Sequence, residues 1–575
     1  MSRALRGALV AVLLAAGVPA AAQAAAAPAP PQTILQDDAV LLHSTDAGVK
    51  DAMTQLRALG VDQVRLTAGW SVIAPQPDSP TRPAFDDTDP AAYPADSWAN
   101  LDRAVRDASD AGLKVMIDIA FWAPRWATQD DPSASGRLRT DIDPDAYARF
   151  AKAVATRYSG TYAPPAATHD APPAGPSPDA DLFGALLGGG RTKPSGPGPA
   201  PAAPAQPLPA ASTFTIWNEP NHPGFVMPQW ERQGAGWWPR SADIYRAMVR
   251  AAYPAIKQAA PSSTVLIGAT SSGGSSTPGR SGVPPLQFIR ALTCVDARWR
   301  PITTGSCAGY TELPGDGWSH HPYSLRTVPE AQPINRDKLP VASTPRLLAA
   351  LRRLVRMGRL APAADQVWMT EYGYETSPPD PQAPFSPEQQ AGMLARAERL
   401  GTAYPAVRSW PQFLLRDRPA GPAGPRMRVA GDWQTGLEDA DGAEKPAYAV
   451  FRTPVVALCR GAARRRLLVW GRWRDVAGAV AQVQRQAGDT WVDSGRAVSA
   501  GAPSAAVQAV VAWQGGAPAR IHWTAPGGQS ADSAPAEPLP CGVSARSARR
   551  HPQKRGRRHG KVRSGRSAQM PMRKR

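Results

Sequence analysis

Cysteine is scarce in this sequence, and its spacing argues against a zinc site. The 575 residues include only Cys294, Cys307, Cys459 and Cys541, with no C-x-x-C pair and no histidine nearby in sequence, whereas structural zinc sites use closely spaced thiolates and imidazoles. An even number of cysteines is typical of disulfides in an exported chain. Four cysteines allow three pairings, and of these we expect the local ones: Cys294 with Cys307 in a short loop, and Cys459 with Cys541 across a small C-terminal domain.

The sequence also lacks a long apolar segment beyond its N-terminus. At the N-terminus, Arg3 and Arg6 precede the apolar run 7–22, and Ala22-Gln23-Ala24 forms an A-x-A-like cleavage site. This is the layout of a secretory signal peptide. The alternative is an uncleaved membrane anchor, but the run is shorter than the ~20 apolar residues that a spanning helix needs. We therefore expect a signal peptide over 1–24 and a secreted protein with no transmembrane segment after cleavage.

Acidic residues are absent from the C-terminal tail, 544–575. The tail contains 13 Lys and Arg and carries most of the formal net charge of +18. A block of like charges is normally disordered and solvated, and on an exported protein it would attract anionic cell-envelope polymers and hold the protein at the cell surface. Nucleic-acid binding is the alternative for a basic tail, but export and the lack of a nucleic-acid fold motif argue against a nucleic-acid partner.

The sequence does contain a regular alternation of strand-like and helix-like segments. Such an alternation predicts a parallel sheet covered by helices, an α/β fold. Eight strand–helix units are the number that closes a (β/α)₈ barrel, which we expect over 34–452. The expected strands are 39–43, 61–70, 114–122, 214–217, 265–268, 318–323, 366–370 and 407–415.

Two regions do not fit the plain barrel. The segment 160–211 is dominated by Pro, Ala and Gly, so it cannot bury enough apolar surface to fold alone. It is expected to be a flexible loop and not a domain linker, because barrel strands are expected on both sides of it. Such a loop could cover the cleft or decorate the far face. Because it starts before the fourth strand, on the non-catalytic side, we expect decoration. From 455 to 541, short alternating runs separated by Gly and Ser predict a small β-sandwich, whose Trp residues either form its core or bind sugar.

Two of the expected strands end on a glutamate, Glu219 in T-I-W-N-E-P-N and Glu371 in V-W-M-T-E-Y-G. A carboxylate at the end of a buried strand is costly unless it is paired or functional, and the catalytic residues of a (β/α)₈ barrel lie at these strand ends. Two such carboxylates are the minimum for cutting a glycosidic bond. One must keep its proton while the other stays ionised.

Several neighbours of the two glutamates are candidate substrate contacts. Asn218 is placed to bind a sugar hydroxyl, and Trp residues at expected strand ends either offer flat faces to sugar rings or pack in the core. Asp118 lies in the middle of the third strand, where we expect it to pair with Arg65 or another buried base and not to act in catalysis. The Trp residues concerned are Trp70, Trp122, Trp126, Trp217 and Trp410.

The two motifs resemble those of the clan A glycoside hydrolases, and most closely the family 39-like and family 5-like retaining glycosidases of bacteria. W-N-E-P at Glu219 resembles the acid/base signature of this clan, and T-E-Y-G at Glu371 resembles its nucleophile strand. The resemblance covers 41–452 and implies that Glu219 is the acid/base and Glu371 the nucleophile. It further implies an arginine near the nucleophile (Arg65), a histidine and a tyrosine lining the site (His321 and Tyr323), and a tryptophan under the sugar (Trp410).

The resemblance therefore implies a secreted hydrolase that cleaves O-glycosidic bonds, of the β configuration, in a polysaccharide, oligosaccharide or glycoconjugate, with no metal and no cofactor. Two alternatives use the same residues. The first is a surface protein that binds carbohydrate without cleaving it, although a decayed site would be expected to have lost at least one of Arg65, Asn218, His321 and Tyr323. The second is a transglycosylase, in which a sugar replaces water as the acceptor.

Overall fold

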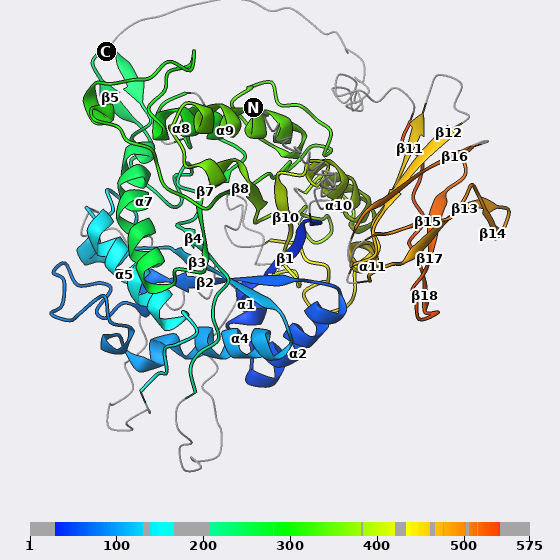
Figure 1. The fold of residues 1–575 in the computed structure, drawn as a ribbon, viewed down its shortest axis with the longest axis horizontal. Coiled ribbons are helices and arrows are strands. Elements are labelled where there is room, and N and C mark those ends of the chain that lie inside the picture. Colours follow the sequence, from blue (N-terminus) through cyan, green and yellow to red (C-terminus); the bar gives the residue numbers. More distant parts are fainter. Residues whose placement is uncertain are drawn as a thin grey trace, which may run out of the picture.

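A computed structural model of the chain describes residues 29–129, 138–165, 206–275, 277–279, 281–380, 383–419, 433–460, 466–474, 476–501, 505–513 and 516–540. Eight parallel strands close into a barrel in the order β1-β10-β9-β8-β7-β4-β3-β2, and antiparallel sheets follow toward the C-terminus (Figure 1). The predicted fold, a (β/α)₈ barrel followed by a β-sandwich, is confirmed. The expected signal peptide, most of the expected flexible insert and the basic tail lie outside the described residues.

Helices cover the outside of the barrel, as the alternation of the sequence predicts. The barrel strands are β1 (Gln32–Gln36), β2 (Gln63–Gly69), β3 (Lys114–Ala120), β4 (Thr213–Ile216), β7 (Thr264–Ser271), β8 (Gly317–His321), β9 (Val367–Met369) and β10 (Val407–Phe413). The helices are α1 (Asp38–Leu41), α2 (Asp46–Ala58), α3 (Trp70–Ile73), α4 (Ala99–Asp110), α5 (Pro144–Arg157), α7 (Arg240–Ala259), α8 (Pro285–Leu292), α9 (Thr344–Arg356), α10 (Pro387–Gly401) and α11 (Pro446–Arg452).

Local sequence signals explain where the helices begin. α5 begins with Pro144 after the N-cap Asp143, whose carboxylate accepts hydrogen bonds from two backbone amides of the first turn. α10 begins with a capping box in which Ser386 and Gln389 bond each other's backbone amides. Both arrangements satisfy amides that have no partner inside the helix, so these starts could be placed from the sequence to within a residue.

The first barrel strand is not at 39–43, where the apolar run indicates it. β1 is Gln32–Gln36, and most of the run belongs to the helical turn α1. Asp37 caps this turn, because its carboxylate accepts a hydrogen bond from the Val40 amide at 3.2 Å. The prediction was wrong because a short apolar run does not distinguish a strand from a buried helical turn.

The inside of the barrel changes from apolar to polar along its axis. Ile34, Met116 and Leu266 are fully buried in a cluster with Trp368, and they come from alternate strands, as in the layered interior of this fold. Closer to the carboxyl ends of the strands, the buried side chains become polar and charged. They include Arg65, Thr67, Asp118, Thr215, Ser319 and Thr370. Burying polar groups costs free energy unless they are paired, so this layer is where a functional site is expected.

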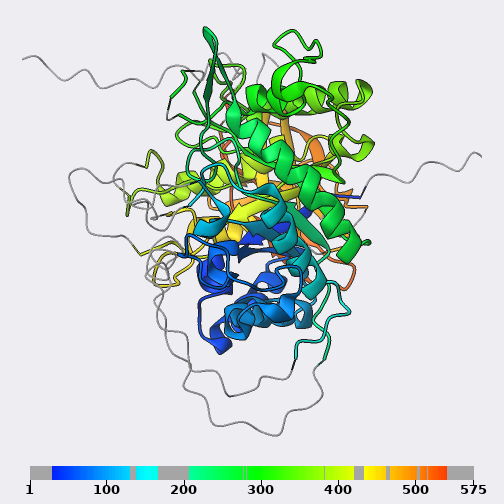
Figure 2. The ribbon, with the colours of Figure 1, turned by 90° about the vertical axis from the view of Figure 1, so that its left-hand side faces the viewer.

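The described residues that flank the expected insert, after α5 and before β4, lie on the side of the barrel opposite to the glutamates. These flanks run side by side, since the Leu208 amide donates to the Tyr162 carbonyl and the Ala211 amide to the Tyr158 carbonyl, both at 2.9 Å. Ala211 lies just before the amino end of β4, whereas Glu219 follows its carboxyl end. Figure 2 shows the helix layer outside the barrel, with α7 and α5 next to each other.

The C-terminal strands form two facing sheets around a separate core. The first sheet contains β11 (Val455–Arg460), β12 (Arg466–Gly471) and β16 (Val507–Ala512), and the second contains β13 (Val480–Ala487), β14 (Thr490–Asp493), β15 (Val498–Ser499), β17 (Ala519–Thr524) and β18 (Ser530–Asp532). Trp473, Trp513 and Trp523 lie in the core between the sheets, each at most 5 % exposed. For these three tryptophans, the core alternative therefore holds.

The expected disulfide between Cys294 and Cys307 is present. The other expected bridge involves Cys541, which lies outside the described residues, so that pairing stays a prediction. Among the helices that the structure describes, none combines the length and the apolar character needed to cross a membrane.

Candidate active site

Glu219 and Glu371 meet at the carboxyl ends of β4 and β9. One oxygen of each carboxylate and one ring nitrogen of His321 all lie within 4.8 Å of one another. The two carboxylates remain 14 % and 12 % exposed, so both can reach a molecule that enters from solvent. This short separation fits the geometry in which one carboxylate attacks the sugar directly, because an intervening water molecule requires ~6.5–9.5 Å.

The backbone around Glu219 adopts an unusual conformation that turns the side chain into the site. Trp217 and Glu219 have φ angles of 61° and 38°, in the left-handed region that residues other than glycine rarely adopt. Hydrogen bonds hold this turn: the Trp217 amide donates to the Tyr147 hydroxyl at 3.0 Å, and the Glu219 amide donates to the Ala269 carbonyl at 2.9 Å. Such strain persists only where the surroundings enforce it, which is common at functional sites.

Arg65 connects the two carboxylate-bearing strands from inside the barrel. Its Nη1 lies 2.6 Å from Glu371 Oε1, and its Nη2 donates to Asn218 Oδ1 at 3.1 Å. The same Nη2 forms an ion pair with Asp118 Oδ2 at 2.9 Å, as the sequence predicts. Gln36, at the end of β1, also accepts a hydrogen bond from Nη1. The fully buried guanidinium therefore fixes Glu371 next to the residue that precedes Glu219.

His321 and Tyr323 contact the carboxylates from the end of β8. His321 Nδ1 lies 3.0 Å from Glu219 Oε1 and 3.5 Å from Glu371 Oε2, and the Tyr323 hydroxyl donates to Glu371 Oε2 at 3.3 Å. Burial lowers the pKa of His321 well below its usual value, with Arg65 acting in the same direction. The imidazole is therefore neutral, and its Nδ1 lies close to both carboxylates. His320 instead bonds Thr270 and the Leu339 carbonyl, which is a structural role.

The two carboxylates lie in different electrostatic surroundings. Burial, followed by the negative charge of Glu371, raises the pKa of Glu219 well above its usual range. Burial also raises the pKa of Glu371, to about 7, and the charge and hydrogen bond of Arg65 oppose this rise. Glu371 therefore ionises first while the proton stays on Glu219. Glycoside cleavage requires this division between an ionised carboxylate and a protonated one.

Three of the predicted tryptophans pack against other aromatic rings or bond a backbone carbonyl. Trp70 is fully buried and stacks on Phe150, and Trp126 packs against Trp70 and Phe85. The indole of Trp122, 3 % exposed, donates to the Gly224 carbonyl in the loop that follows Glu219. Trp70 is therefore a core residue, whereas the expected sugar contacts of Trp122 and Trp126 stay predictions.

The expected position of Trp410 under the sugar is corrected by the structure. Its indole is 3 % exposed and packs against α10, where a Cβ at Gly401 would lie 2.0 Å from the ring. The ring also contacts Tyr372, at 5.1 Å between centroids. A side chain buried against the helix layer does not lie under a sugar, so we withdraw Trp410 from the expected substrate contacts.

Two residues near the site were missed from the sequence. Gln36 was missed because the first strand was misplaced. Trp433 is partly exposed and lies 6.1 Å from Tyr323 and 5.6 Å from Phe413 between ring centroids. It is therefore better placed than Trp410 to offer an aromatic face beside Glu371. Trp433 was missed because it lies in an irregular segment, outside any strand-like pattern of the sequence.

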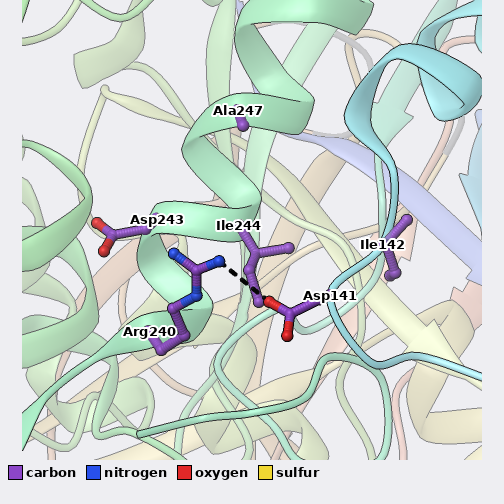
Figure 3. Close-up of a pocket in the computed structure, with 6 residues that line it drawn as sticks. All are labelled: Asp141, Ile142, Arg240, Asp243, Ile244 and Ala247. Atoms are coloured by element: carbon purple, nitrogen blue, oxygen red, sulfur yellow. Dashed lines mark hydrogen bonds and ion pairs between the residues drawn. The ribbon is translucent and has the colours of Figure 1, made fainter. Parts of the chain in front are cut away.

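A small cavity of about 160 Å³ lies elsewhere on the barrel, between the start of α7 and the segment before α5 (Figure 3). Arg240 pairs with Asp141 at 3.1 Å, and Asp243 accepts a hydrogen bond from the Trp238 indole at 2.8 Å. Because these charged groups are already paired and no predicted site residue lines the cavity, the two glutamates remain the candidate active site. The lining residues are Asp141, Ile142, Arg240, Asp243, Ile244 and Ala247.

Comparison with known proteins shows a similarity of fold. No protein-family model matches the sequence, and no curated protein matches it. Among solved structures, GH5_18 from Streptomyces cattleya, in complex with GlcNAc, is 15 % identical with a TM-score of 0.40, over 73 % of this chain and 79 % of that chain. The endo-β-1,4-mannanase from Thermotoga petrophila is 10 % identical with a TM-score of 0.37, over 89 % and 98 %.

A third similar structure is the exo-β-1,4-mannosidase Op5Man5 from Opitutaceae bacterium strain TAV5. It is 12 % identical with a TM-score of 0.36, over 74 % of this chain and 59 % of that chain. The chain is thus similar in structure to glycoside hydrolases of family 5, at low sequence identity. At these identities, the similarity concerns the barrel fold.

Proposed function

We propose that the protein is an exported retaining glycoside hydrolase that cleaves O-glycosidic bonds, of the β configuration, in a polysaccharide or glycoconjugate. The observation that carries this proposal is the geometry of the two carboxylates. Glu219 and Glu371 have oxygens within 4.8 Å of each other, and only Glu371 is paired with a buried arginine. This arrangement provides a proton donor and an ionised nucleophile at the spacing that double displacement uses.

In the first step, Glu371 attacks the anomeric carbon while Glu219 gives its proton to the leaving oxygen, so the glycosidic bond breaks and a glycosyl ester forms on Glu371. Ester formation removes the charge of Glu371, which is one of the causes that raise the pKa of Glu219. That pKa therefore falls, and Glu219 can take a proton from water. The water oxygen bonds to the anomeric carbon and displaces Glu371, which leaves the configuration of the sugar unchanged.

Trapping of the glycosyl ester tests the proposal most directly. A panel of 2-fluoro-glycosides with good leaving groups, in both anomeric configurations, is incubated with the purified protein. We expect one β-configured member to add the mass of its sugar to a peptide that contains Glu371, because fluorine slows both steps and the good leaving group speeds only the first. The Glu371→Gln variant serves as the control and should stay unlabelled. Oligosaccharide binding without any adduct would instead favour the non-cleaving carbohydrate-binding protein.

Azide rescue tests the role of Glu219 separately. In Glu219→Ala, a substrate with an activated aryl leaving group still forms the ester, because that group departs without a proton, but the ester then lacks a base to activate water. We expect azide to restore turnover by a factor within the ~10²–10⁴-fold that a positioned acid–base group contributes. The glycosyl azide should keep the substrate's configuration, whereas rescue of Glu371→Ala should invert it. No rescue of Glu219→Ala would contradict the assignment.

We also propose that the protein is secreted and that its basic tail, 544–575, holds it near anionic polymers of the cell envelope. The support comes from the sequence: the leader has the layout of a signal peptide, and the tail contains 13 basic and no acidic side chains. Such attachment would concentrate the enzyme close to envelope-bound polysaccharide.

A further inference from the structure

The guanidinium of Arg65 is shared between the proposed nucleophile and a second buried carboxylate. Nη1 lies 2.6 Å from Glu371, and Nη2 lies 2.9 Å from Asp118 on the neighbouring strand β3. Both Arg65 and Asp118 are fully buried. One cation therefore balances two carboxylates in an environment where an unpaired charge is very costly.

Asp118 is held in place on both sides. In the barrel register it lies level with Thr67 of β2 and Thr215 of β4. The Thr215 hydroxyl donates to Asp118 Oδ1, and Arg65 lies against Asp118 Oδ2. Asp118 is 0 % exposed, so it cannot touch a substrate. Its influence on the reaction must pass through Arg65.

The other titratable groups around this pair come from five elements. Asp38 of α1, Tyr147 of α5 and Tyr245 of α7 interact electrostatically with Asp118. Burial raises the pKa of each of these tyrosines above the usual value, so both are neutral. Around Glu371, the groups are Glu219 beyond β4, and His321 and Tyr323 at the end of β8. None of these is a second cation, so Arg65 dominates the field that stabilises ionised Glu371.

We propose that Asp118 is a positioning residue that holds Arg65 in place and, by taking part of its charge, sets the pH at which Glu371 becomes an active nucleophile. This inference rests on the proposed function, because it assigns Asp118 a role in the same site. The sign follows from the charges. Arg65 lowers the pKa of Glu371 and Asp118 raises it, while burial is the largest cause of the rise. Removing the charge of Asp118 should therefore lower the pH at which Glu371 ionises.

The test uses Asp118→Asn, which keeps the shape of the side chain and removes its charge. In the wild type, kcat/KM for an aryl glycoside should rise with pH around the pKa of Glu371, about 7. In Asp118→Asn, we expect this midpoint to move down by about one pH unit, within the 1–3 units typical of a neighbouring charge. A purely structural role would lower kcat/KM at every pH and leave the midpoint where it is. An unchanged or higher midpoint would overturn the inference.

Two further variants keep the test decisive. Thr215→Val removes the hydroxyl that stabilises ionised Asp118, so it should move the midpoint in the same direction by less, even if Asp118→Asn does not fold. Asp102→Asn is the matched control. Asp102 is a buried carboxylate on α4 that pairs with Arg157, so its loss should reduce stability without moving the midpoint.

A proton-uptake titration separates this inference from the proposed function. In a Glu219→Gln background, where the coupled proton of Glu219 is absent, the difference between Glu371 and Glu371→Gln reports the proton bound at Glu371, and the same difference is then measured with Asp118→Asn added. We expect the midpoint to fall by about one pH unit whether or not any glycoside is cleaved. A shift in a protein that cleaves nothing would support control of Glu371 ionisation by Asp118 and reject the hydrolase. Turnover with no shift in the titration would reject only the inference.

Discussion

Replacing Glu371 by Gln is expected to lower kcat/KM for a cleaved glycoside by about 10⁵-fold, the scale of losing a covalent nucleophile. The amide oxygen can still accept a hydrogen bond from Arg65 Nη1, which lies 2.6 Å from Oε1, so the site should keep its shape. The neutral amide cannot attack the anomeric carbon. Binding of an oligosaccharide product, measured by calorimetry, should therefore stay within a few-fold of the wild type while steady-state turnover is lost.

Glu312→Gln provides the matched control for this prediction. Glu312 is exposed and lies shortly before β8, at the amino end of the barrel, so the same chemical change there should leave kcat/KM within about twofold, as is usual for surface substitutions. If Glu371→Gln retained more than about one hundredth of the wild-type rate, another group would have to be the nucleophile. Equal losses in both variants would point to a general loss of folded protein.

The central residues of the candidate site could be predicted from two signals, the strand ends and the resemblance of short motifs to those of clan A glycoside hydrolases. Glu219, Glu371, His321 and Tyr323 all lie at or just beyond the carboxyl ends of strands whose positions the hydrophobic pattern marks. In a parallel barrel these ends face the same side, so sequence position alone brings them together. Arg65 lies within β2 and points inward, and its partner Asp118 was also expected.

The aromatic residues could not be predicted in the same way, because their role depends on which side of a strand they face. In β10 the pairing register with β9 shifts between Val407 and Ser409. A shift of one residue moves each later side chain to the opposite face of the sheet. The face on which Trp410 lies therefore cannot be deduced from its position along the strand. Trp433 lies outside any strand, and its proximity to Tyr323 depends on the path of an irregular segment.

The contact between the barrel and the C-terminal sheets could not be predicted from the sequence either. Arg472 and Arg474 follow β12 in the C-terminal region, yet both reach Glu398 on α10 of the barrel. Arg472 further donates to the Pro31 carbonyl at 2.8 Å, and Arg474 to Thr33 Oγ1 at 2.6 Å, at the start of β1. No local pattern indicates this pairing, because charged residues in a turn are normally solvated.

Replacing Glu398 by Ala is therefore expected to destabilise the protein by about 3–5 kcal/mol, the cost of removing one partner from a buried ionic group. The side chains of Glu398, Arg472 and Arg474 are at most 4 % exposed. Burial already lowers the pKa of Arg474 to about 10, with the charge of Glu398 opposing this. Without Glu398, two guanidinium groups would remain buried with no carboxylate between them. The measurement is the denaturant midpoint for loss of barrel structure.

Glu330→Ala is the appropriate comparison, because Glu330 pairs with Arg396 on the same helix, α10, and both side chains are 16 % exposed. A more exposed pair contributes about 1 kcal/mol or less, so this variant should shift the midpoint much less. Replacing Glu398, Arg472 and Arg474 together by apolar residues of similar volume should recover most of the loss, since no buried charge would then lack a partner. If Glu398→Ala were no more destabilising than Glu330→Ala, the buried ionic group of Glu398, Arg472 and Arg474 would not be what holds the barrel against the sheets.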